Sequence, residues 1–277
     1  MKTKLIPIFT ILFCRVTIAM CGTDDDDLIA YFNSCNIGEV YGNMALKACE
    51  NMGQDGNKTI LFSSAKTLSE KGYSIGDFLL GWCYEGGEGC KFDPSLAFEY
   101  FSKAAKSSIP FPWSFRSLGE CYFYGQGTPE DYNQALYWFK EAVKTIKYDF
   151  FLSDTYYCMG VIFQHGGNGI MIDLRQCCIY YELAAKLGHW DAAWNLSNRY
   201  LKGEGVTKDL QKSLYWAKEA AELGHSQAQF FIGISYLFGE YDDLQTPIDK
   251  QKGIEWLKKS AEQGYIHAMK VLNDIGL

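Results

Sequence analysis

The sequence has no long apolar run after its first 20 residues, and it has no excess of basic residues. A membrane-spanning helix needs about 20 consecutive apolar residues, so we expect no span in the mature chain. With 26 Lys and Arg against 33 Asp and Glu, the formal net charge is -7. An acidic chain is a poor nucleic-acid binder. The sequence also has no Cys-x-x-Cys pair, and we predict no cofactor and no metal site.

The first 19 residues resemble a secretory signal. Lys2 and Lys4 precede an apolar run over residues 5–14, and Ala19 offers a small residue for cleavage. Arg15 ends this run at about half the length that a membrane anchor requires. We therefore predict a cleaved signal peptide over residues 1–19.

Residues 20–35 are expected to form an acidic, flexible N-terminus, because four consecutive aspartates occupy positions 24–27. The last five residues, 273–277, do not match a lumenal retention tail. Together with the signal, this predicts a secreted protein or one in a lumen or periplasm.

A pattern recurs five times between residues 75 and 265 at intervals of about 40 residues, which is typical of a helical-repeat solenoid. Each copy has a small anchor residue preceded by an apolar one. An aromatic residue follows three positions later, and a small residue lies five positions earlier, so these residues share one helical face. The anchors are Gly81, Gly119, Gly160, Ser197 and Gly233.

After this first helix comes a glycine loop, an aspartate and a second helix. The Gly-x-Gly loops permit a left-handed helix end and a sharp reversal. The aspartate is predicted to cap the second helix, because its carboxylate can accept the free backbone N–H groups there. These predicted caps are Asp93, Asp131, Asp173, Asp209 and Asp249.

This combination of residues closely resembles the Sel1-like repeat family of tetratricopeptide-like helical hairpins. The resemblance implies an all-α fold, a right-handed α/α superhelical solenoid of about five to six helix-turn-helix repeats. We predict five repeats at 75–113, 114–152, 153–190, 191–226 and 227–265. A degenerate repeat over 36–74 and a helix over 266–277 are expected to cap the two ends.

The resemblance also implies function. Members of the family mostly act as adaptors in macromolecular complexes, including degradation of misfolded proteins in the secretory pathway and host interactions of secreted bacterial proteins. We therefore predict an interaction scaffold for a protein or peptide, and the oligomeric state stays open.

The partner is expected on the face of each first helix that lies opposite its packed stripe. In the superhelix that the resemblance implies, this face lines the inner surface and holds the residues three before, one after and four after each anchor. Large aromatics with a few polar groups suit an extended peptide or a helix. Alternatively, the aromatics three before the anchor serve packing alone. The predicted partner-binding residues are Phe78, Trp82, Arg116, Phe123, Tyr157, Trp194, Asn198, Phe230 and Ile234.

An enzyme is the alternative, because a cysteine-rich branch of the family is linked to penicillin binding and weak β-lactam hydrolysis. Ser63 and Lys66 fit a Ser-x-x-Lys pattern. The partner motifs Ser-Asp-Asn and Lys-Thr-Gly are missing from the sequence, so we predict no catalytic residue. His189 and His225 each follow a glycine that ends a helix, and we expect them to be ordinary surface histidines.

The sequence has ten cysteines, and the nine that remain after loss of Cys14 with the signal indicate disulfide bonds in an exported chain, with one cysteine left over. Equivalent cysteines in adjacent repeats should lie beyond the Cα separation of about 7 Å that a disulfide spans, so partners are sought within a repeat. Buried free thiols are the alternative. Asn57, in Asn57-Lys58-Thr59, is the glycosylation candidate. The candidate disulfide pairs are Cys35 with Cys49, Cys83 with Cys90, and Cys158 with Cys177 or Cys178.

Overall fold

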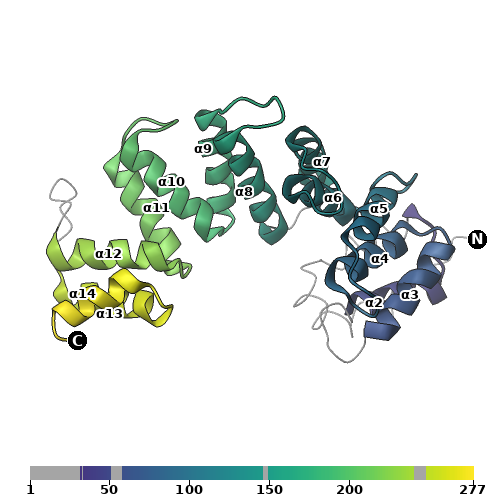
Figure 1. Cartoon of the computed structure of the whole chain (residues 1–277), viewed down its shortest axis with the longest axis horizontal. Coiled ribbons are helices and arrows are strands. Elements are labelled where there is room, and N and C mark those ends of the chain that lie inside the picture. The colour runs from purple at the N-terminus through teal and green to yellow at the C-terminus, as the bar shows by residue number, and fades with distance from the viewer. Residues whose placement is uncertain (1–31, 33, 51–57, 146–148, 240–247) are drawn as a thin grey trace, which may run out of the picture. The chain divides into compact units, whose positions relative to one another are not determined.

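The computed structural model describes residues 32, 34–50, 58–145, 149–239 and 248–277 (Figure 1). The predicted signal peptide, the aspartate run at 24–27 and Asn57 lie outside these residues. Within them the regular structure is helical, and extended pairing is confined to a bridge between Gly167 and Ile170. The predicted all-α repeat solenoid is confirmed.

The chain divides into two compact units, Met1–Phe151 and Leu152–Leu277, and each is described separately. The boundary falls inside α8 (Asp149–His165). Unit 1 contains α2 (Glu39–Glu50), α3 (Lys58–Glu70), α4 (Ser74–Gly86), α5 (Pro94–Ala105), α6 (Trp113–Tyr124) and α7 (Tyr132–Thr145). Unit 2 contains the rest of α8 and then α9 (Leu174–Lys186), α10 (Trp190–Lys202), α11 (Leu210–Glu222), α12 (Ser226–Phe238), α13 (Lys250–Glu262) and α14 (Ile266–Asp274).

The helices pack as antiparallel hairpins, α4 with α5 and α6 with α7 in unit 1, and α10 with α11 and α12 with α13 in unit 2. All five predicted aspartate caps are confirmed, since each carboxylate accepts backbone N–H groups in the first turn of a second helix. Asp93, for example, accepts from Ser95 and Leu96 at 3.1 Å. The caps fix where each second helix begins.

The anchor glycines let the two helices of a hairpin touch closely. A Cβ atom at Gly119 would lie 2.6 Å from the ring of Phe139, and one at Gly81 would lie equally close to Phe101. The fourth repeat has a serine, not a glycine, at the same contact. Its anchor Ser197 is buried and donates to the carbonyl of Ser213 at 2.8 Å. A small residue at the anchor is therefore a packing requirement.

The second glycine of three Gly-x-Gly loops, Gly89, Gly127 and Gly205, contacts the preceding second helix. A Cβ at Gly127 would lie 2.0 Å from the carbonyl oxygen of Pro94, at the start of α5. Gly89 has the same relation to Lys58, at the start of α3. In this contact α3 takes the place that α5 takes in the next repeat, and the degenerate repeat over 36–74 stays a prediction.

Each unit has its own apolar core. The core of unit 1 includes Leu79, Phe101 and Leu118, and the main core of unit 2 includes Tyr181 and Leu196. Among the helices of the described residues, none combines the length and apolarity needed to span a bilayer. The helices are instead amphipathic elements that bury one side in these cores.

Candidate protein-binding face

Phe78 corrects the sequence prediction, because the structure buries it. Its side chain is 4% exposed, and its ring centroid lies 4.9 Å from that of Phe111 and 6.1 Å from that of Trp113. Phe111 lies eight residues before the next anchor, just ahead of α6. Phe78 therefore ties α4 to the segment that leads into α6 and is not available to a partner.

The same joint recurs in unit 2, where three of the predicted partner residues take part in it. In the third and fourth repeats the aromatic residue three before the anchor contacts the residue eight before the next anchor, and in the fifth repeat it contacts the residue just before α14. Tyr157 and Trp194 stack on histidines, and Phe230 packs on a tyrosine. The centroid distances are 4.2 Å for Tyr157 and His189, 5.4 Å for Trp194 and His225, and 5.3 Å for Phe230 and Tyr265.

His189 and His225 also cap helices, which corrects the expectation that they are ordinary surface histidines. The Nδ1 atom of His189 accepts from the backbone N–H of Ala192 at 3.3 Å, in the first turn of α10. The Nδ1 atom of His225 accepts from the backbone N–H of Ala228 at 3.2 Å, in the first turn of α12. Sequence reasoning missed this role, although alignment at eight residues before the anchor shows the position.

Each cap histidine faces a carboxylate on the preceding first helix. The Nε2 atom of His189 lies 3.6 Å from Asp154, and that of His225 lies 3.4 Å from Asp191. An Asp–His pair is also the core of many catalytic sites. Here Nδ1 holds a backbone N–H and Nε2 faces the carboxylate, so no ring nitrogen is left to serve as a general base. These pairs are joints between repeats.

Arg116 occupies the equivalent position in the second repeat, and its contacts differ. Its guanidinium pairs with Glu120 at 2.7 Å and lies 5.1 Å from the ring centroid of Phe151. Glu85, on α4, faces the same charge. Burial raises the pKa of Glu85, and the nearby Arg116 partly offsets this rise. A mixed charged and aromatic surface results in unit 1.

The other predicted partner residues are half-buried on the first helices. Trp82 packs at the edge of the unit 1 core, and Phe123 contacts the rings of Tyr132 and Phe139. Asn198 donates to the carbonyl of Trp194 at 3.0 Å, and Ile234 borders the core near α14. All retain some exposed surface. Their role in partner binding stays a prediction.

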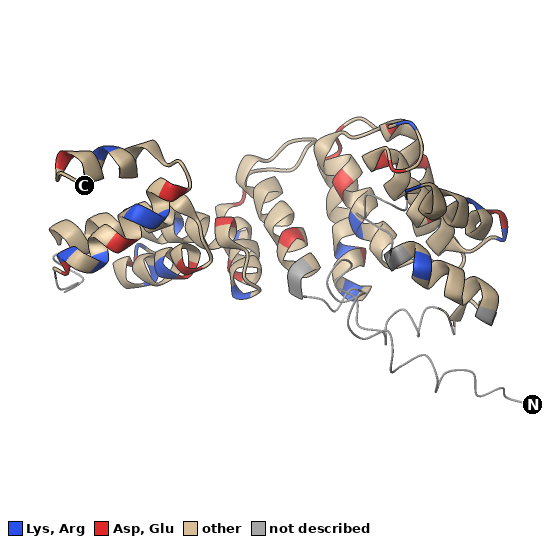
Figure 2. Ribbon diagram, turned by 90° about the horizontal axis from the view of Figure 1, so that it is seen from below, with Lys and Arg blue, Asp and Glu red and all other residues tan. Residues whose placement is uncertain are grey.

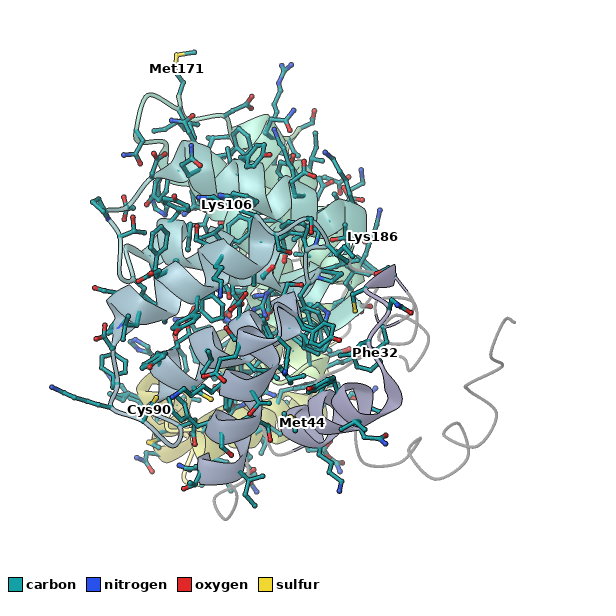
Figure 3. The ribbon with its side chains drawn as sticks, turned by 90° about the vertical axis from the view of Figure 1, so that its right-hand side faces the viewer. Phe32, Met44, Cys90, Lys106, Met171 and Lys186 are labelled. Atoms are coloured by element: carbon teal, nitrogen blue, oxygen red, sulfur yellow. The ribbon has the colours of Figure 1, made fainter. Side chains whose placement is uncertain are left out.

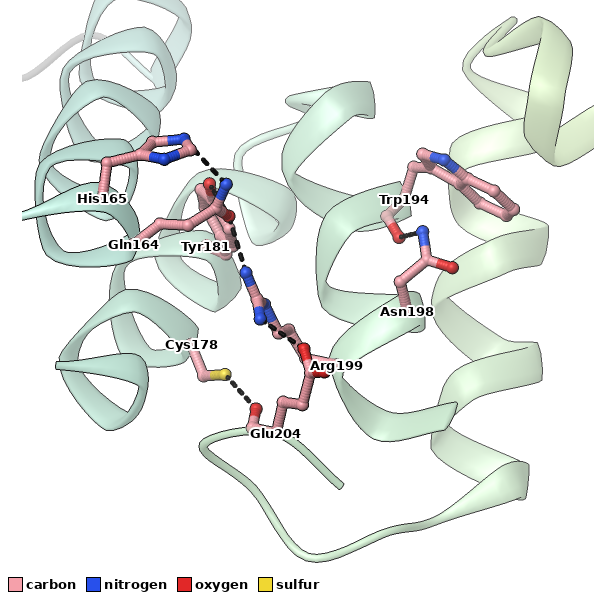
Figure 4. Close-up of polar contacts among 8 residues, drawn as sticks. All are labelled: Gln164, His165, Cys178, Tyr181, Trp194, Asn198, Arg199 and Glu204. Carbon is pink, nitrogen blue, oxygen red and sulfur yellow. Dashed lines mark hydrogen bonds and ion pairs between the residues drawn. The ribbon is translucent and has the colours of Figure 1, made fainter. Parts of the chain in front are cut away.

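A polar network beside this face ties α8, α9 and α10 together (Figure 4). The side-chain oxygen of Gln164 accepts from the hydroxyl of Tyr181 at 2.9 Å and from Arg199 at 2.8 Å. Arg199 also pairs with Glu204 at 2.5 Å. These contacts hold the third and fourth repeats together. The sequence analysis did not predict them.

The structure does not show the predicted disulfides. Cys83, Cys90, Cys177 and Cys178 are free thiols, so neither the bridge within the first repeat nor a bridge from Cys158 to α9 is formed. The side chain of Cys49, the predicted partner of Cys35, lies outside the described part. Burial raises the pKa of the Cys83, Cys121 and Cys177 thiols to about 12, which suppresses the reactive thiolate.

The Ser-x-x-Lys pattern lies on the exposed side of α3. The hydroxyl of Ser63 donates to the carbonyl of Ile60 at 3.0 Å, and Lys66 is exposed. An activated serine instead gives its proton to a neighbouring base. This arrangement gives the hydrolase alternative no support.

Known proteins show similar repeats. The Sel1 repeat family matches five segments of the chain, residues 74–108, 116–144, 153–189, 190–225 and 226–265. A Sel1 repeat protein from Oxalobacter formigenes has a similar crystal structure, with a TM-score of 0.68 and 26% sequence identity over 83% of this chain and 89% of that chain. No curated protein is significantly similar in sequence.

A second solved structure is c5321, a protective antigen present in uropathogenic Escherichia coli strains displaying an SLR fold. It aligns with a TM-score of 0.71 and 24% identity, covering 94% of this chain. This chain spans about half the length of that protein, since 55% of c5321 is covered. The likeness shows that the two share a fold.

Proposed function

We propose that this chain, which belongs to the Sel1 repeat family, is an exported scaffold that binds a polypeptide. Sel1 repeats suggest protein partners, and this supports the proposal. The proposed binding face is the exposed side of the first helices, here called the first-helix face. In unit 2 it consists of α8, α10 and α12. The lack of charged residues in α12 carries the proposal.

The contrast between α12 and α13 is the main observation. The sequence of α12 contains no Asp, Glu, Lys or Arg, although half-buried Phe230 and Ile234 lie on it. The adjacent α13 has an exposed charged surface, as expected for a helix side in water. Its charged residues are Lys250, Lys252, Glu255, Lys258, Lys259 and Glu262.

The first-helix face of unit 2 repeats from helix to helix. Val161, Asn198 and Ile234 each follow an anchor directly, on α8, α10 and α12, and each is half-buried. An apolar stripe with a polar amide in its centre suits a segment that offers apolar side chains and backbone hydrogen bonds. We propose that the partner contributes such a segment.

Unit 1 offers a different chemistry on its first helices. Glu85 is accessible to solvent, although neighbouring groups partly desolvate its carboxyl, and Glu120 is already paired with Arg116. Figure 2 shows acidic and basic residues interspersed along the ribbon of this unit. We propose that this part of the face accepts a polar stretch of the partner that includes a basic residue, which the free carboxylate of Glu85 would favour.

Export is proposed from residues 1–19, which have the charged start, apolar run and small residue of a signal peptide. In a lumen, periplasm or extracellular space, the scaffold would serve protein quality control or a host interaction. The partner decides between these roles.

Affinity measurement with a face variant tests the proposal. The mature chain is used to capture exported proteins, the partner is identified, and its dissociation constant is measured by calorimetry. In the face variant, Val161, Asn198 and Ile234 are each changed to Glu. We expect at least a tenfold loss of affinity, because buried charge at an interface centre is costly.

A matched control places three glutamates on second helices, at the exposed Ile179, Gln211 and Tyr215. Circular dichroism verifies that both variants retain their helices. Equal affinity of the face variant and the control would contradict the proposed face.

A further inference from the structure

Two joints of unit 2 are built alike around a histidine. In the first, His189 caps α10, stacks on Tyr157 and faces Asp154. In the second, His225 caps α12, stacks on Trp194 and faces Asp191 (Figure 4 shows Trp194). The side chains of these histidines are 10% and 13% exposed. Both rings are therefore largely withdrawn from water.

The cap defines the protonation state that the fold requires. A backbone N–H points at Nδ1 of each ring, at 3.3 Å in His189 and 3.2 Å in His225. Nδ1 must then be an acceptor, so the ring is neutral and its proton lies on Nε2. Protonation of Nδ1 would oppose two N–H donors and would place a positive charge at the positive end of a helix dipole.

The groups around His189 shift its pKa in opposite directions. Burial lowers the pKa of His189, and the carboxylates of Asp154 on α8 and Asp191 on α10 oppose this effect. Asp191 also faces His225, whose hydrogen bond holds the pKa of that carboxyl below its usual range. For His189 the burial effect is the largest. The folded joint at His189 thus prefers the neutral ring more than water does.

We propose that His189 and His225 hold the third, fourth and fifth repeats together at neutral pH as locks, and that the lock at His189 is acid-sensitive, because its joint loosens when the ring becomes protonated. The first lock fixes α10 against α8, and the second fixes α12 against α10. This device stands on the joint geometry and does not depend on the proposed partner.

Asparagine variants keep the helix cap but remove the titratable ring, so they test the lock apart from the cap. In the His189→Asn, His225→Asn double variant, the amide oxygen can accept the same backbone N–H, because Asn is among the best N-cap residues. It cannot become protonated. The matched control changes the two exposed histidines, His165 and His267, to Asn and leaves both locks in place.

Hydrogen exchange of the full chain gives the readout. Opening equilibria for the first turns of α10 and α12 are measured at pH 7.5 and pH 5.0, after correction for intrinsic exchange rates. We expect acid to increase opening in the wild type and in the control, by about tenfold for each unit by which a histidine pKa lies below its ordinary value. The double variant should show a much smaller increase. An equal increase in all three proteins would overturn the proposal.

Nitrogen NMR of the wild type gives a second measurement that needs no variant. We expect the proton of both cap histidines on Nε2 at neutral pH, and a His189 titration midpoint below about 6.5. A proton on Nδ1, or a midpoint above that value, would contradict the lock.

Discussion

The two units join their repeats at the same positions with different chemistry. In unit 1, Phe78 packs against Phe111, which is 2% exposed, and against Trp113. In unit 2, Tyr157 and Trp194 meet histidines that also cap helices and face carboxylates. The first joint is apolar and has no titratable group, whereas the others depend on a neutral ring.

The helix caps show the consequence of this difference. The helix α6 has no side-chain cap, and its N-cap position is Pro112. In contrast, α10 and α12 are capped by their joint histidines. An aromatic pair contributes about 0.5–1.5 kcal/mol beyond burial, and an N-cap contributes about 1 kcal/mol. In unit 2 one histidine provides both the aromatic contact and the N-cap, and the joint therefore becomes sensitive to pH.

The largest expected effect comes from removing the apolar joint. Phe111→Ala should destabilise the chain by about 3–5 kcal/mol, because it leaves a cavity beside Phe78. The loss should be the same at pH 7.5 and pH 5.0. Urea unfolding at both values measures it. A loss below 1 kcal/mol would mean that Phe111 does not hold the joint.

The next effect concerns the close contact within a hairpin. Gly119→Ala should cost about 1–3 kcal/mol, because its Cβ would overlap the ring of Phe139. Gly42→Ala in α2 is the control, since its Cβ would make an ordinary contact at 3.8 Å with Ile37. We expect the control to be neutral or stabilising in the same unfolding experiment. Similar losses in both variants would contradict the packing account.

A smaller effect is expected at the aspartate caps. Asp131→Ala should lower the free energy of unfolding by about 1 kcal/mol, because two backbone N–H groups in α7 lose their acceptor. Asp131→Asn retains a side-chain oxygen and should lose only a small part of this. If Asn and Ala behave alike, the carboxylate does not act as a cap.

The subtlest test compares how the units respond to acid. The pKa of His189 is lowered by burial, so its contribution to stability is present above about pH 6.5 and is lost as the pH falls through the folded value. The pKa of Glu85 is raised by burial, so acid favours the fold there. Hydrogen exchange between pH 7 and pH 5 should therefore show unit 2 loosening while unit 1 does not. Equal loosening of both units would remove the distinction.

The fold could be predicted because its signals are local. Asp93 and Asp209 cap helices that begin directly after them, and the anchors Gly119 and Gly233 need only a neighbouring helix in the same hairpin. Such signals repeat in every copy of the pattern. They depend on contacts between residues that lie close in sequence, so the pattern alone reveals them.

The candidate site was harder to predict because its packing joins residues that are far apart in the sequence. Phe78 and Trp194 occupy the same repeat position, yet one is buried and the other half-buried. The residue that each contacts decides this, and that residue lies more than 30 positions later in the chain. The histidine locks were missed for the same reason. The sequence would have revealed them if the residue three positions before one anchor had been compared with the residue eight positions before the next anchor.

Surface features unrelated to this face show why exposure alone does not mark a site. Met171, at a loop tip before α9, is 85% exposed (Figure 3). The neighbouring Ile172 packs beside Gly166 at the end of α8, because a Cβ there would lie 3.2 Å from its side chain. The conformation of this loop is explained by its contact with the end of its own helix. Repetition across helices, rather than exposure, distinguishes the first-helix face.

Photo-crosslinking tests the central claim, that a polypeptide partner binds the first helices, most directly. A photoreactive amino acid is placed at Ile234 on α12 or, as the comparison, at Ile179 on α9, and the chain is irradiated with its partner. We predict a covalent adduct with the partner from position 234 and none from position 179. Adducts from position 179 alone would contradict the account.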